Sequence, residues 1–109
     1  MSERNTQLLI EDIKDAAQKI LAYTQGMDYN AFTSDDKTID AVVRNFEVIG
    51  EAAKRVSIEY KTQNANIPWA HMVGFRNRII HEYFGIDYEI VWQIIQNNIP
   101  ALIQQLNRF

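Results

Sequence analysis

The chain has 109 residues, with 11 Lys and Arg, 14 Asp and Glu and no Cys, so its formal net charge is −3 at pH 7. This balance argues against a protein that coats nucleic acid through a broad basic surface, and the lack of cysteine excludes disulfides and cysteine metal sites. The hydrophobic fraction of 47% is that of a globular protein, so we expect one domain over residues 1–109. No apolar run reaches the length of a secretion signal or a membrane span, which predicts a cytoplasmic protein away from membranes.

Two helices are predicted in the first half of the chain. Apolar residues recur at three- and four-residue spacing over residues 5–25, as on one face of a helix. A second apolar stripe begins near Ser34, a plausible N-cap, and fades by Tyr60, after which residues 61–66 read as a polar loop. Gly50 lies inside this second helix and costs about 1 kcal/mol relative to alanine, which predicts that another helix approaches closely there.

Two more helices are predicted in the second half. The third starts at Pro68, a good first-turn residue, runs toward Tyr83 and is closed by Gly85. The fourth starts with Asp87 as its cap, and Pro100 should kink or split it. Strand signals are absent. The expected fold is therefore all-α, an antiparallel four-to-five-helix bundle.

The densest polar segment is residues 74–85, at the end of the predicted third helix. Arg76 and Arg78 supply positive charge suited to phosphate. His81 can exchange protons near neutral pH, while Asn77 and Tyr83 offer hydrogen-bonding groups. The same residues on an ordinary solvated helix face are the alternative interpretation.

The spacing of Arg76 and His81 sets a geometric problem. On one straight helix they lie about 140° apart, so they cannot both face one atom. Either the helix loosens near Gly85, or a second copy of the chain completes the site. The second option predicts a homodimer whose cleft holds both residues of both chains and is locally positive.

The motif resembles a known family. Arg76, four residues, His81, one residue and Tyr83 match the Arg-x4-His-x-Tyr signature of HepT-like proteins of the HEPN superfamily, with a polar residue, Asn77, after the arginine. The similarity extends in order and spacing to three flanking segments, residues 48–54, 67–69 and 84–87.

The resemblance implies an endoribonuclease toxin that needs no metal and no cofactor. Arg76 and His81 would be catalytic at a homodimer cleft, and Asn77, Arg78 and Tyr83 would hold the RNA substrate. The implied partner is a cognate nucleotidyltransferase antitoxin that silences the toxin by adding AMP to Tyr83. A non-catalytic HEPN module that binds a nucleotide or a partner protein is the alternative. A metal shared with His71, ten residues before His81, is improbable because the two lie on different helix faces.

Overall fold

The computed structural model describes residues 5–81 and 85–108. These residues are predominantly helical, which confirms the all-α prediction. They form helices α1 (Thr6–Thr24), α2 (Tyr29–Thr33), α3 (Asp36–Arg55), α4 (Ile58–Gln63), α5 (Trp69–Val73), α6 (Phe75–Ile79), α7 (Tyr88–Asn97) and α8 (Ile99–Leu106), and strands β1 (Ile80–His81) and β2 (Gly85–Ile86).

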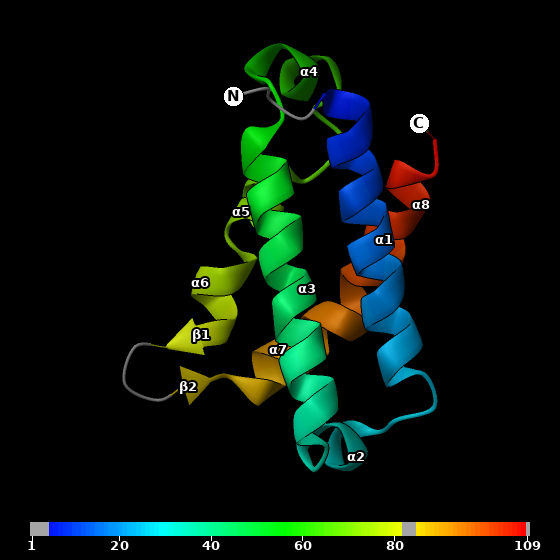
Figure 1. Ribbon diagram of the computed structural model, residues 1–109, viewed down its shortest axis with the longest axis vertical. Coiled ribbons are helices and arrows are strands. Elements are labelled where there is room, and N and C mark those ends of the chain that lie inside the picture. The colour runs from blue at the N-terminus through cyan, green and yellow to red at the C-terminus, as the bar shows by residue number, and fades with distance from the viewer. Residues whose placement is uncertain (1–4, 82–84, 109) are drawn as a thin grey trace.

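The two long helices, α1 and α3, run antiparallel side by side at the centre of the molecule (Figure 1). Helix α8 packs against α1, whereas α5 and α6 pack against α3. Strands β1 and β2 lie beyond α6, on the side of α3 away from α1 (Figure 1). The polar segment of the motif is thus carried at one flank of the bundle.

The start of α3 differs by one residue from the prediction. Asp35, rather than Ser34, is the N-cap, and its Oδ1 accepts a hydrogen bond of 3.1 Å from the backbone N–H of Thr38. The Ser34 hydroxyl instead donates to the carbonyl of Asn30 at 2.7 Å and ends α2. A carboxylate satisfies the free N–H groups of a first turn as well as a hydroxyl does, so either residue fitted the pattern.

The predicted polar loop at residues 61–66 is partly wrong, because α4 extends into it as far as Gln63. The chain leaves α3 at Val56, which is extended, and restarts at Ser57, whose hydroxyl accepts from the backbone N–H of Tyr60 at 3.2 Å. No residue of α4 is fully buried. Tyr60 packs against the core as a partly buried residue, and its ring meets that of Trp69 edge to face. A helix without an apolar stripe leaves no periodic signal in the sequence.

The third helix was predicted to run without a break from Pro68 toward Tyr83, and this prediction is wrong. It is broken at Gly74, which ends α5 and begins α6, and it stops at Ile79. Ile80 is extended, with φ −115° and ψ 120°. The backbone N–H of Asp87 donates to the carbonyl of Ile79 at 2.7 Å, so this helix-end carbonyl is satisfied from outside the helix.

A short antiparallel hairpin replaces the last turns of that helix, although no strand was expected. Ile80 pairs with Ile86, and His81 pairs with Gly85. Gly85 has a φ of +76°, the left-handed region that glycine enters without steric cost. Strands of two residues are too short to show alternation, which explains why the sequence did not reveal them.

The fourth predicted helix is confirmed, including its cap and its break. Asp87 is the N-cap of α7 and its Oδ1 accepts from the N–H of Ile90 at 3.1 Å. The helical path breaks at Asn98, and α8 then begins with Pro100 in its first turn. The break turns α8 back onto α1, which closes the bundle.

The close approach predicted at Gly50 is also confirmed. A Cβ atom at Gly50 would lie 3.3 Å from the carbonyl oxygen of Met72 and 3.6 Å from that of Val73, at the end of α5. Nearby, the buried rings of Phe46 and Phe75 meet edge to face, with centroids 5.3 Å apart. These two contacts fix α5 and α6 against α3, and so fix the place of the motif.

Candidate active site

Helix α6 presents its polar side chains to solvent because its apolar ones are anchored in the core. Phe75 and Ile79 are buried. The three residues between them, Arg76, Asn77 and Arg78, are all exposed. A helix of five residues therefore places two guanidinium groups and one amide on the protein surface, where phosphate can reach them.

Arg76 and Asn77 border a hollow of about 300 Å³ between α3 and α6. We call it the α3–α6 hollow, and its lining residues are Glu47, Gly50, Glu51, Lys54, Val73, Arg76 and Asn77. Arg76 forms no ion pair with any residue in the described ranges, whereas Glu51 pairs with Arg55 at 3.9 Å. Among the described residues, the Arg76 guanidinium thus has no carboxylate partner where it borders the hollow.

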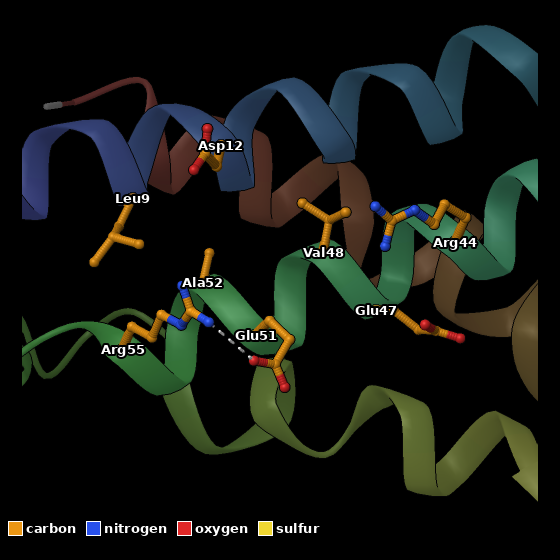
Figure 2. Close-up of a pocket in the computed structure, with 8 residues that line it drawn as sticks. All are labelled: Leu9, Asp12, Arg44, Glu47, Val48, Glu51, Ala52 and Arg55. Carbon is orange, nitrogen blue, oxygen red and sulfur yellow. Dashed lines mark ion pairs between the residues drawn. The ribbon is translucent and has the colours of Figure 1, made fainter. Parts of the chain in front are cut away.

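A second hollow, of about 250 Å³, lies on the other side of α3, between α3 and α1 (Figure 2). Glu47 and Glu51 border both hollows. The basic residues here, Arg44 and Arg55, flank these two carboxylates along α3, and in Figure 2 Arg55 turns toward Glu51. This face of α3 is of mixed charge, so it does not extend a basic surface from Arg76.

His81 lies on β1, with 45% of its side chain exposed. Its Nε2 atom is 3.2 Å from Oδ2 of Asp87. Both residues border a broad, open hollow of about 660 Å³, which we call the His81 hollow and which is lined by Tyr29, His81, Ile86, Asp87, Tyr88 and Glu89. A large ligand can thus reach the imidazole from this hollow, while the Asp87 carboxylate contacts its Nε2 atom.

The charge of Asp87 is stabilised by its surroundings. The hydrogen bond from the backbone N–H of Ile90 is the main cause that holds the pKa of this carboxyl below its ordinary value of 3.8, and the neighbouring His81 lowers it further. Asp87 is therefore ionised at neutral pH, which suits an acceptor of a hydrogen bond from an imidazole N–H.

The described part of one chain does not bring all the predicted site residues together. Arg76 and Asn77 border one hollow and His81 borders another. Arg76 and His81 do not share one helix, because α6 ends at Ile79 and His81 stands on a strand. Of the two options left open by the sequence, the chain does loosen before Gly85, and Arg76 and His81 then border different hollows. Tyr83 lies outside the described residues.

Sequence reasoning identified Asp87 only as a helix cap and missed its contact with His81. The available signal was Gly85 between them, since a glycine with positive φ lets the chain fold back within a few residues. His71 is exposed on α5. Within residues 5–81 and 85–108, no group of three or more His, Asp or Glu side chains is placed to hold a metal ion, and no helix is long and apolar enough to cross a membrane.

Comparison with known proteins gives the family. The sequence model described as "Ribonuclease HepT-like" matches residues 2–109. The chain is 36% identical over 106 residues to "Putative RNase MJ1380" of Methanocaldococcus jannaschii, and the aligned residues make up 97% of each of the two chains. It is 38% identical over 93 residues to "Probable ribonuclease HepT" of Thermococcus cleftensis, covering 85% of this chain and 84% of that one. No solved structure matches significantly. The chain belongs to the HepT-like ribonuclease family.

Proposed function

We propose that this protein is a metal-independent endoribonuclease, with Arg76 and His81 as its catalytic residues. The observation that carries the proposal is the exposed imidazole of His81 at 3.2 Å from the Asp87 carboxylate, in a chain of a ribonuclease family. RNA contains its own nucleophile, the 2′-hydroxyl. Cleavage therefore requires proton transfer and charge stabilisation rather than a bound water.

The chemistry follows from the residue types. His81 takes the proton of the 2′-hydroxyl as its oxygen attacks the adjacent phosphorus, and the imidazolium so formed gives a proton to the departing 5′-oxygen as the bond between phosphorus and that oxygen breaks. The products are a 2′,3′-cyclic phosphate and a 5′-hydroxyl. Arg76 stabilises the negative charge that develops on the phosphorane, and Asn77 and Arg78 hold neighbouring phosphate oxygens.

Cleavage of a mixed-sequence single-stranded RNA in EDTA tests this assignment. His81→Ala should lower the rate by roughly 10²–10⁴-fold, the usual contribution of acid–base catalysis. His71→Ala is the matched control, because His71 is also an exposed histidine but lies on α5. Full activity of His81→Ala, or loss of wild-type activity in EDTA with recovery in magnesium, would contradict the proposal.

The fact that Arg76 and His81 border different hollows supports a homodimer in which one chain supplies the arginine and its partner the histidine. Mixing Arg76→Ala with His81→Ala protein distinguishes this arrangement from a site built within one chain. If the site is shared, each mixed dimer contains one intact pair, and activity returns. If each chain uses its own two residues, every site in the mixture has a defect and the mixture stays inactive.

We further propose that the protein is a toxin, silenced by a nucleotidyltransferase antitoxin that adds AMP to Tyr83. The support is the match of Tyr83 to the family signature, and AMP there would add bulk and negative charge beside the phosphate-binding residues. Intact mass after co-expression with the neighbouring gene tests it. An AMP adduct on the wild type that disappears in Tyr83→Phe supports the site, and an adduct that persists in Tyr83→Phe contradicts it.

The alternative is a non-catalytic module that binds a nucleotide or partner protein. Its support is the same separation of the Arg76 and Asn77 hollow from the His81 hollow. It predicts RNA or nucleotide binding that is unchanged by His81→Ala, with no cleavage by either protein.

A further inference from the structure

The Asp87 carboxylate has two partners, one for each oxygen. Its Oδ1 accepts the hydrogen bond from the backbone N–H of Ile90 that starts α7. Its Oδ2 lies 3.2 Å from Nε2 of His81. Since the first bond is part of a helix N-terminus, it restricts the rotation of the carboxylate and so the positions that Oδ2 can take.

The backbone around the pair is held on both sides. The N–H of Asp87 donates to the carbonyl of Ile79 at 2.7 Å, and His81 is paired with Gly85 across the hairpin. Asp87 is thus attached to the end of α6 through its backbone and to the start of α7 through its side chain. The distance between Asp87 and His81 is set by secondary structure rather than by the two side chains alone.

We propose that Asp87 is a positioning residue for His81, which holds the proton of the neutral imidazole on Nε2 and leaves Nδ1 to take the proton of the RNA 2′-hydroxyl. The inference rests on the proposed role of His81. An ionised carboxylate only accepts hydrogen bonds, so the ring nitrogen that faces it must be the donor. In a neutral imidazole, the other nitrogen is then the base.

The other described groups around the imidazole do not compete for Nε2. The His81 hollow also contains the Glu89 carboxylate and the hydroxyls of Tyr29 and Tyr88, but among the described residues only Asp87 lies within hydrogen-bond distance of the ring. Once Asp87 occupies Nε2, Nδ1 is the ring nitrogen that remains for a ligand in this open hollow. The same contact prevents the half-exposed ring from rotating freely in solvent.

Asp87→Asn tests the inference with little disturbance of the fold, because asparagine caps helices about as well as aspartate. With Oδ1 still accepting from Ile90, the amide NH₂ takes the place of Oδ2 and becomes a donor toward Nε2. Neutral His81 must then carry its proton on Nδ1, the wrong nitrogen for the reaction. Asp87→Ser is a second variant that also caps α7 but has no second oxygen to reach His81.

Asp35→Asn is the matched control. Asp35 caps α3 with the same bond, Oδ1 to the N–H of Thr38 at 3.1 Å, and has no histidine partner. It reports what loss of a carboxylate at a helix N-terminus does by itself. Two measurements are compared in all proteins: long-range ¹H–¹⁵N NMR spectra, which identify the protonated ring nitrogen of neutral His81, and kcat and KM on a mixed-sequence single-stranded RNA.

The wild type and Asp35→Asn should show the proton on Nε2, and Asp87→Asn should move it to Nδ1. The kcat of Asp87→Asn and Asp87→Ser should fall by at least tenfold, with KM changed less than twofold. An unchanged tautomer together with full activity in Asp87→Asn would overturn the inference. Full activity of His81→Ala would instead overturn the proposed function, and the NMR spectra would still decide whether Asp87 sets the tautomer.

Discussion

Replacement of Gly50 tests how tightly α3 and α5 are packed beneath the candidate site. Alanine gains about 1 kcal/mol of helix propensity over glycine. Its Cβ, however, would lie 3.3 Å from the carbonyl oxygen of Met72, so the end of α5 must move by a few tenths of an ångström. The two effects nearly cancel, and we expect Gly50→Ala to change the free energy of unfolding by less than about 1 kcal/mol.

Valine at position 50 should destabilise the protein much more than alanine does. Its two methyl groups extend past Cβ into the same carbonyl groups, and one χ1 rotamer dominates in a helix, so the side chain cannot turn away. Overpacking of this kind costs about 1–3 kcal/mol, to which valine adds roughly 0.5 kcal/mol of poorer helix propensity. We therefore expect Gly50→Val to be about 1.5–3.5 kcal/mol less stable than Gly50→Ala.

Urea unfolding at one protein concentration measures both variants. The control is the pair Asp40→Ala and Asp40→Val, because Asp40 is exposed on α3 and reports the propensity difference alone. If Gly50→Val and Gly50→Ala differ by no more than the Asp40 pair, the close contact of α3 with α5 does not exist.

Three further outcomes are expected. The pKa values of Asp35 and Asp87 are lowered, mainly by the backbone N–H groups that they cap. The two carboxylates therefore stabilise the folded protein fully above the ordinary pKa of 3.8, and this stabilisation is lost as the pH falls through their lower pKa values in the folded state. Asp35→Asn should accordingly show a smaller fall in Tm than the wild type on acidification. Phe75→Ala should lower the free energy of unfolding by about 3–5 kcal/mol in denaturant titrations, because it empties a fully packed position. His71→Ala should leave stability within about 0.5 kcal/mol of the wild type, since the side chain is exposed; a larger loss would reveal a contact of this residue in an assembly.

The parts of the fold that the sequence predicted are those with a periodic or a steric signature. The apolar stripes of α1 and α3 bury residues at helical spacing, and Pro100 and Gly50 each act through a single steric effect. Helix α4 and the β1–β2 hairpin were not predicted, because neither depends on periodic burial. They are held by local hydrogen bonds, to the Ser57 hydroxyl in one case and from the Asp87 N–H in the other, and by a few partly buried residues on the core.

The candidate site was likewise predicted only in part. The residue types of Arg76 and His81 indicated phosphate and proton chemistry, and both side chains are exposed. Their relative placement could not be predicted, because it depends on where α6 stops. At that point the carbonyl of Ile79 accepts a hydrogen bond from the N–H of Asp87, eight residues later, and no helix-period pattern contains such a bond. The same Asp87 contacts His81 through its side chain.

Because strands β1 and β2 are so short, His81 and Asp87 can separate without unfolding of the whole protein. Two paired residues on each strand form a ladder that is marginal by itself, and the packing of Ile80 and Ile86 against the core supports it, so β1 and β2 can separate at less free energy than global unfolding requires. Opening separates His81 from Asp87 while α1 and α3 stay folded. The fraction of molecules in which His81 is paired with Asp87 is therefore set by a local equilibrium. Hydrogen exchange at the Asp87 amide reports this equilibrium, whereas a melting curve of the whole bundle does not.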